Sequence, residues 1–104
     1  MRETGSSISE WIADTFGTTG TNERVAIRAN EEMAELLRAV ADGTPADKVR
    51  EECADVVIVL ARVCARFGGD LFAEIDRKME INRGRKWALD GSGCGYHVKP
   101  TETV

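Results

Sequence analysis

Two groups of acidic residues flank a Gly-Thr-Pro turn at positions 43–45, and their spacing suits the binding of divalent metal ions. In a helix, residues three apart share a face, so Glu32 and Glu35 form one carboxylate pair and Glu52 and Asp55 form another. The pairs lie at mirrored distances from the turn, so two antiparallel helices would bring them level. Four acids that converge beside apolar side chains need positive charge between them, because burying unpaired charge is costly.

The ligand set of Glu32, Glu35, Glu52 and Asp55 contains only oxygen donors, which favours Mg²⁺, with Mn²⁺ as an expected substitute. The one histidine, His97, lies far along the chain, and this argues against a di-iron centre built on Glu-x-x-His pairs. Acids at this spacing also occur on the solvated faces of charged helices. The mirrored register favours the metal site over that alternative.

Glu31 and Glu51 are less well determined by the pattern. Each is turned by about 100° on its helix from its acidic neighbour. Three roles stay open for them: surface residues, groups that orient a water, or ligands of a second ion.

A basic segment near the end of the last predicted helix supplies side chains suited to a polyphosphate. The stretch "KMEINRGRKW" concentrates cations in a protein whose net charge is -4. Beside a Mg²⁺ centre, arginine gives planar bidentate contacts to phosphate and lysine gives a point charge. Alternatively, cations near a helix C-terminus simply oppose the helix dipole. Trp11 and Trp87 could each stack on a base or simply pack. The candidate substrate-binding residues of the segment are Lys78, Asn82, Arg83, Arg85, Lys86 and Trp87.

Two helices that fold back on each other must position the acids. Over about 23–42, apolar residues form one broad stripe with charges elsewhere, which predicts an amphipathic helix. Gly43 ends it, and Thr44 with Pro45 supplies a predicted N-cap and first-turn proline for a helix over about 45–67. That helix contains "VVIVLA", a run typical of strands. Its unbroken hydrophobicity instead predicts a helix buried on all faces at the centre of a bundle.

Two shorter helices flank this hairpin. Ser7 and Glu10 have the spacing of a capping box, and apolar residues at helical intervals then predict a helix that ends before Gly17. After two glycines at 68–69, Asp70 caps a further helix that ends near the basic segment. Beyond Ala88 the glycine-rich tail is predicted to be loosely structured.

Length and composition predict one domain that binds neither nucleic acid nor membrane. A chain of 104 residues fits one domain, and its pI near 5.0 argues against binding to a polyanion. The sequence has no apolar run of about 18 residues and no signal-peptide core, which predicts a cytoplasmic protein. Three cysteines without paired spacing suit a reducing compartment. Cys94 and His97 supply only two of the four ligands that a structural zinc site needs.

The acidic and basic motifs together resemble the MazG-like, all-α nucleoside triphosphate pyrophosphohydrolases. The resemblance rests on Glu-Glu-x-x-Glu at 31–35, Glu-Glu-x-x-Asp at 51–55 and Lys-x-x-x-Asn-x-x-Arg-Lys-Trp at 78–87. It spans roughly positions 24–87. The opening "ISEWIADTFG" further resembles the small phage-type members, including the MazZ enzymes that act on purine deoxynucleotides. The chain has one copy of the motif, unlike longer two-domain relatives.

The resemblance implies a four-helix-type bundle in a single domain over 1–104, with a core at about 7–87 and a flexible tail at about 88–104. It implies homodimers or homotetramers in the cytoplasm, or in the host cytoplasm if the protein is viral. The implied reaction is Mg²⁺-dependent cleavage of a (d)NTP, such as dGTP or dATP, to the monophosphate and pyrophosphate. Two or three metal ions are assigned to Glu32, Glu35, Glu52 and Asp55, and the phosphates to Lys78, Asn82 and Arg85.

Under this hypothesis Glu35 is the first candidate for the catalytic base that activates a water, and Glu31 is the second. Lys78, Arg83 and Arg85 would offset the charge of the leaving pyrophosphate. Two rivals stay open: a dUTP- or dCTP-directed hydrolase on the same scaffold, and a non-enzymatic helical module that binds a partner protein. Base specificity cannot be read from the sequence, because it depends on a few groups placed by folding.

Overall fold

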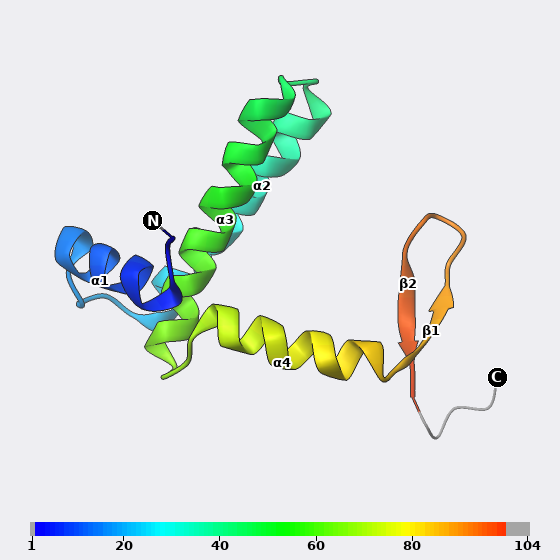
Figure 1. The fold of residues 1–104 in the computed structure, drawn as a ribbon. Coiled ribbons are helices and arrows are strands. Elements are labelled where there is room, and N and C mark those ends of the chain that lie inside the picture. The colour runs from blue at the N-terminus through cyan, green and yellow to red at the C-terminus, as the bar shows by residue number, and fades with distance from the viewer. Residues whose placement is uncertain (1, 100–104) are drawn as a thin grey trace. The chain divides into compact units, whose positions relative to one another are not determined.

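The computed structural model describes residues 2–99, which form four helices and one two-stranded hairpin (Figure 1). The mostly helical fold confirms the predicted class, whereas the hairpin was not predicted. No helix in the described residues combines the length and apolar character needed to cross a bilayer. The chain divides into two compact units, Met1–Ala73 and Glu74–Val104, and each is described by itself. The elements are α1 Gly5–Phe16, α2 Asn22–Ala41, α3 Ala46–Arg66, α4 Leu71–Arg83, β1 Lys86–Leu89 and β2 Gly95–Val98.

Helix α1 begins earlier than the sequence pattern predicted, because Thr4 and not Ser7 is its N-cap. The Ser7 backbone N–H donates to Thr4 Oγ1 over 3.0 Å, and the Thr4 backbone N–H donates to Ser7 Oγ over 2.8 Å. The two residues therefore form a reciprocal capping box, in which Ser7 occupies the position that is usually glutamate or glutamine. Glu10 takes no part in it.

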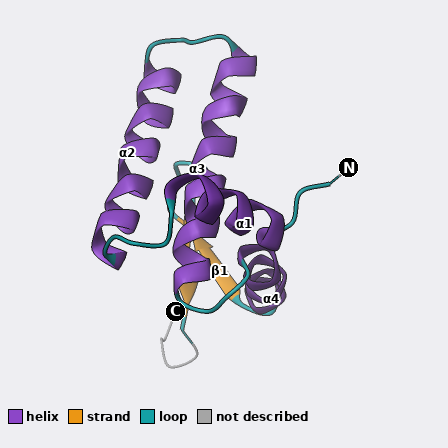
Figure 2. Ribbon diagram, turned by 90° about the vertical axis from the view of Figure 1, so that its left-hand side faces the viewer, coloured by secondary structure: helices purple, strands orange, loops and turns teal. Residues whose placement is uncertain are grey.

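Helices α2 and α3 form the predicted antiparallel hairpin and lie side by side in Figures 1 and 2. Thr21 is the N-cap of helix α2, and its side chain accepts the Arg24 N–H over 3.0 Å. Gly43 ends the α2 region with a φ of 69°, a left-handed conformation that favours glycine. The prediction that Thr44 caps α3 is wrong: Pro45 holds the N-cap position, and no side chain caps this helix.

Helix α3 is the central element of the N-terminal unit, since it packs against both α1 and α2. The buried apolar core is small and consists of Ile12, Val25, Val56 and Ala61, each at most 7% exposed. The prediction that α3 is buried on all faces is wrong for the isolated chain, because Val57 and Leu60 are 36% and 39% exposed. The predicted homo-oligomer would cover such side chains and stays a prediction.

The contact between Gly5 and Asp70 joins the start of α1 to the start of α4. Gly5 is buried, and a methyl group added there would lie 1.5 Å from Asp70 Oδ1. The Asp70 side chain also caps the start of α4, because its Oδ2 accepts the Ala73 N–H over 3.0 Å. Tight packing around Gly5 therefore protects the N-cap of α4.

We expect Gly5→Ala to lower the free energy of unfolding by about 1–3 kcal/mol, the usual cost of overpacking. Urea denaturation followed by circular dichroism measures it. Gly84→Ala is the matched control, since the nearest atom to its added methyl group is the Ile81 carbonyl oxygen at 3.5 Å. Equal stability of Gly5→Ala and the unmodified protein would contradict the close contact with Asp70.

The C-terminal unit corrects the prediction of a loosely structured tail beyond Ala88. Strands β1 and β2 pair in antiparallel fashion, with Trp87 opposite His97. In the connecting loop, Asp90 Oδ1 accepts the Ser92 N–H over 2.9 Å, and Gly91 and Gly93 adopt positive φ angles. An Asp-Gly turn of this kind is a hairpin signal. Residues 100–104 of the predicted tail lie outside the described residues.

Lys86 and Trp87 therefore lie on β1 and not at the end of a helix. The Trp87 indole N–H donates to the Asn82 carbonyl over 2.9 Å, and its ring centroid lies 6.0 Å from that of His97. These contacts favour a packing role for Trp87 over the predicted role in base stacking. Cys94 and His97 are not part of any metal-capable cluster found among the described side chains.

Candidate functional site

Three carboxylates converge between α2 and α3. Glu32 comes from α2, Glu52 and Asp55 come from α3, and each offers one oxygen within 4.8 Å of the other two. The antiparallel hairpin brings these residues together, as the mirrored spacing predicted. Glu35, the fourth predicted ligand, is not a member of this three-residue cluster. It lies close enough to Glu32 for its carboxylate to raise the pKa of that residue.

The carboxylate cluster carries more negative than positive charge, and one of its members, Glu32, is buried. Glu32 is 5% exposed, and burial is the main cause that raises its pKa, with further contributions from Glu35 and Asp55. Arg28 pairs with Glu32 and opposes this rise. Glu32 Oε2 and Glu52 Oε2 are buried and accept no hydrogen bond. Orphaned hard oxygens of this kind fit a Mg²⁺ or Mn²⁺ ion.

Arg28 is a site residue that the sequence analysis missed. It donates to Glu31 Oε2 over 3.0 Å and also pairs with Glu32, so one guanidinium serves two adjacent carboxylates. The signal was present in the sequence, since Arg28 lies three and four residues before these acids and such pairs meet on a helix. Arg28 partly neutralises the cluster from the side of α2.

Glu31 and Glu51 lie at the surface and are engaged by cations. The Glu31 carboxylate makes ion pairs of 3.0 Å with both Arg24 and Arg28, and the Arg24 hydrogen bond is the main cause that lowers its pKa. Glu51 lies 3.5 Å from Lys48. A carboxylate held as an anion by two guanidinium groups is a weak proton acceptor. The geometry thus favours Glu35 over Glu31 as the base.

An apolar cavity of about 360 Å³ opens beside the carboxylates. Trp11 and Phe16 contribute aromatic walls to it, and their rings meet edge to face at a centroid distance of 5.7 Å. Trp11 is 56% exposed, so part of its ring is available to a ligand. The cavity is lined by Trp11, Ile12, Phe16, Arg28, Glu32, Asp55, Ile58, Val59 and Arg62.

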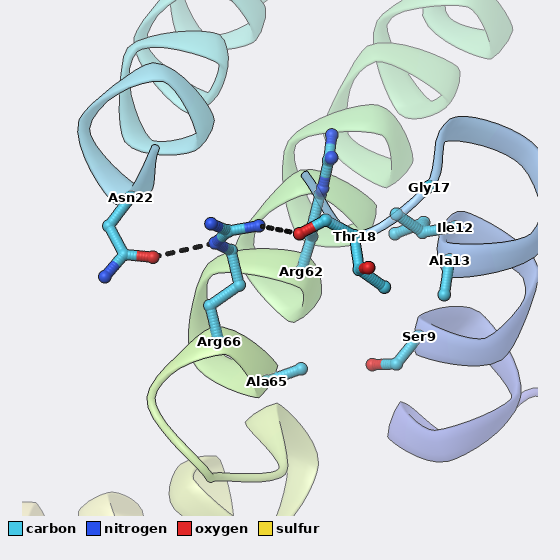
Figure 3. A pocket seen from close by; sticks show the side chains of 9 residues that line it. All are labelled: Ser9, Ile12, Ala13, Gly17, Thr18, Asn22, Arg62, Ala65 and Arg66. Atoms are coloured by element: carbon cyan, nitrogen blue, oxygen red, sulfur yellow. Dashed lines mark hydrogen bonds between the residues drawn. The ribbon is translucent and has the colours of Figure 1, made fainter. Parts of the chain in front are cut away.

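A second cavity of about 390 Å³ lies between α1 and α3, and Figure 3 shows the residues that line it. Arg66 dominates this region: its Nε donates to Asn22 Oδ1 over 2.7 Å, and further N–H groups donate to the carbonyls of Thr18 and Gly20. These bonds fasten the loop between α1 and α2 to α3. Because the Arg66 donors are occupied and this cavity lacks carboxylates, the cavity beside Glu32 is the better ligand site.

The predicted phosphate-binding residues belong to the C-terminal unit. Lys78, Asn82 and Arg83 lie on α4, and Arg85 follows it. Asn82 Oδ1 is buried and accepts no hydrogen bond. The assignment of these residues to phosphates stays a prediction.

We expect Glu32→Gln to raise the melting temperature of the metal-free protein and to abolish stabilisation by Mn²⁺. The folded state raises the pKa of Glu32 above its ordinary 4.5, so stability is present at low pH and falls as pH rises through the raised pKa. Glutamine mimics the protonated form and avoids that loss at neutral pH. A change of about 1 kcal/mol moves the melting temperature of such a domain by roughly 4–8 °C.

Thermal melts in EDTA and in excess Mn²⁺ measure both effects. Glu10→Gln, at an exposed position on α1, is the matched control and should change neither. If Mn²⁺ raises the melting temperature of Glu32→Gln as much as that of the unmodified protein, Glu32 is not a metal ligand.

No protein-family model matches the chain, and no curated protein matches it. Among solved structures, it is similar to the MazG-like pyrophosphohydrolase of cyanophage S-2L, a structure bound to dGDP and three catalytic Mn²⁺ ions per active site. The sequences are 26% identical, the match covers 91% of this chain and 93% of that chain, and the TM-score is 0.66. The match confirms the fold that the acidic and basic motifs predicted.

Proposed function

We propose that the chain, which is similar in fold to the MazG-like pyrophosphohydrolase of cyanophage S-2L, is a phage-type member of that family and a divalent-metal-dependent nucleoside triphosphate pyrophosphohydrolase. Its substrate is a (d)NTP, preferentially a purine dNTP such as dGTP or dATP, and its products are the monophosphate and pyrophosphate. The observation that carries the proposal is the cluster of Glu32, Glu52 and Asp55 at the edge of an aromatic-walled cavity.

Glu32, Glu52 and Asp55 hold the metal ions, with Glu35 next to them as a further ligand. Two buried oxygens without hydrogen-bond partners, on Glu32 and Glu52, support this assignment. When bound, such ions neutralise phosphate oxygens and lower the pKa of a water. Mg²⁺ is the proposed physiological ion, and Mn²⁺, which the cyanophage enzyme binds in three copies per site, substitutes for it.

Glu35 accepts the proton of the attacking water, whose oxygen forms a new bond to the α-phosphorus. The bond from that phosphorus to the oxygen bridging to the β-phosphate breaks, and pyrophosphate leaves. A catalytic base of this kind contributes about 10²–10⁴-fold to the rate. Lys78, Asn82 and Arg85 are the proposed phosphate contacts.

The aromatic-walled cavity takes the nucleoside. Trp11 presents a half-exposed ring on which a base can stack, and stacking on an aromatic ring contributes about 1–3 kcal/mol per base. Ile58 and Val59 extend the apolar lining along α3. The cavity volume of about 360 Å³ falls within the range of about 300–1,000 Å³ usual for small-molecule sites.

The test is a panel of dGTP, dATP, dTTP, dCTP and dUTP, each with Mg²⁺, with Mn²⁺ and with EDTA. Anion-exchange chromatography identifies the nucleotide product, and a coupled assay quantifies pyrophosphate. We expect metal-dependent release of pyrophosphate with the monophosphate in equal amounts, fastest for a purine dNTP. Preference for dUTP or dCTP would contradict the purine assignment alone.

Two outcomes would overturn the whole proposal. One is the absence of pyrophosphate release with either metal. The other is release that persists in EDTA, since the cluster of Glu32, Glu52 and Asp55 would then have no role in the reaction.

A further inference from the structure

Arg62, on α3, lines the cavity beside the carboxylates and has no role in the mechanism above. Its side chain is half-buried, and its guanidinium lies 5.8 Å from the centroid of the Phe16 ring. Within residues 2–99 no hydrogen bond or ion pair engages that guanidinium. Arg66, one turn later, is fully committed to the loop between α1 and α2. Arg62 is therefore a cation whose donors are available to a ligand.

Arg62 lies on the same side of α3 as Asp55, the proposed metal ligand, two turns further along. Seven residues correspond to about 10.5 Å of helix, with a rotation of only about 20°. The backbone of Arg62 therefore lies about 10.5 Å along α3 from that of Asp55. With the α-phosphate at the carboxylates, we place the base beside Arg62 and Phe16.

The walls near Arg62 suit a base better than a phosphate. Phe16 lies beneath its guanidinium, and Trp11 and Ile58 add further apolar surface. An aromatic ring and aliphatic side chains offer no donors to a phosphate, whereas they stack and pack against a planar base. Arg62 supplies the polar group that such a pocket needs in order to fix the orientation of its ligand.

A guanidinium only donates hydrogen bonds, and this restricts the base that it can recognise. Guanine presents two adjacent acceptors, O6 and N7, which arginine contacts in bidentate fashion. Adenine presents N7 beside an N6 amino donor, and cytosine presents an N4 amino donor, so both oppose the guanidinium. Resting on the proposed function, we infer that Arg62 is a specificity-determining residue that selects guanine, so that the preferred substrate is dGTP.

The experiment compares the kcat/KM values for dGTP and dATP in the unmodified protein, Arg62→Lys and Arg62→Gln. The unmodified protein should prefer dGTP. Arg62→Gln should reduce the dGTP-to-dATP ratio by about 10–100-fold, the range expected for one bidentate pair, and Arg62→Lys should reduce it less, because an ammonium still donates to O6 and N7 but lacks the planar fork of arginine. Arg62→Gln should lose more of the ratio, because a glutamine amide can pair with N6 and N7 of adenine.

Binding of dGMP and dAMP, measured by calorimetry with Mn²⁺ present, gives a readout that does not depend on turnover. The ratio of the two dissociation constants should change as the kinetic ratio does. Arg38→Gln is the matched control, since Arg38 is exposed on α2 and lies outside the cavity. Its ratios should equal those of the unmodified protein. Thermal melts identify any variant that has lost its fold, and Arg62→Lys retains the charge over Phe16.

Three results would overturn the inference while leaving the proposed function intact: preference of the unmodified protein for another base, an unchanged ratio in both variants, or an equal loss for every dNTP. The last result would make Arg62 a phosphate contact. Absence of hydrolysis in the unmodified protein would instead count against the proposed function, and the binding ratio would then decide the role of Arg62.

Discussion

Asp55→Asn is expected to lower kcat/KM for the preferred dNTP by at least about 10³-fold. The substitution keeps the shape of the side chain and removes one of the three charges that meet within 4.8 Å. Metal ions supply several kcal/mol of charge stabilisation to a phosphoryl transition state, and each 1.36 kcal/mol corresponds to a factor of ten in rate. Asp55 is exposed, so the fold should tolerate the change.

Steady-state kinetics at several Mn²⁺ concentrations measure this loss. Asp47→Asn provides the matched control: it makes the same chemical change on the same helix, outside the cluster. Asp47→Asn should remain within a few-fold of the unmodified protein. If Asp55→Asn has near-normal kcat/KM at low Mn²⁺, Asp55 is not a ligand, and the cluster is only a solvated acidic surface.

Glu35→Gln is expected to reduce kcat by about 10²–10⁴-fold while Mn²⁺ binding is largely retained. Glutamine cannot accept the proton of the attacking water, but Glu32, Glu52 and Asp55 still offer three carboxylates to the metal. Single-turnover kinetics measure the chemical step, and a Mn²⁺-dependent rise in melting temperature reports metal binding separately. The two measurements together separate the loss of the base from the loss of bound metal.

Glu31→Gln is the comparison for this experiment, because Glu31 is the other candidate base. It removes a carboxylate that already makes two ion pairs of 3.0 Å with Arg24 and Arg28. We expect a much smaller loss of kcat than in Glu35→Gln. The reverse order, with Glu35→Gln near normal and Glu31→Gln inactive, would exchange the two assignments.

The four helices of the described residues follow from local patterns in the sequence. Amphipathic periodicity and the glycines at the helix ends are local signals, so they predict helices without reference to tertiary contacts. Boundaries were less predictable, since Thr4 and Ser7 cap α1 and no side chain caps α3. The hairpin at 86–98 was missed because its strands are only four residues each, although Asp90 and Gly91 carried a turn signal.

The sequence by itself determined the carboxylate cluster to within one residue. Spacing of three residues sets a shared helix face, and mirrored distances from Gly43 set the level of each pair, so Glu32, Glu52 and Asp55 meet for reasons of helix geometry alone.

Only the tertiary structure decided what surrounds those carboxylates. The approach of α1 to α3 creates the aromatic-walled cavity, places Phe16 beneath Arg62 and commits Arg66 to the neighbouring loop. These contacts join residues more than forty positions apart, and no local period encodes them, because they depend on how one helix packs across another. Whether Glu35 joins the three-residue cluster likewise depends on the packing between α2 and α3, which the spacing of residues along one helix does not determine.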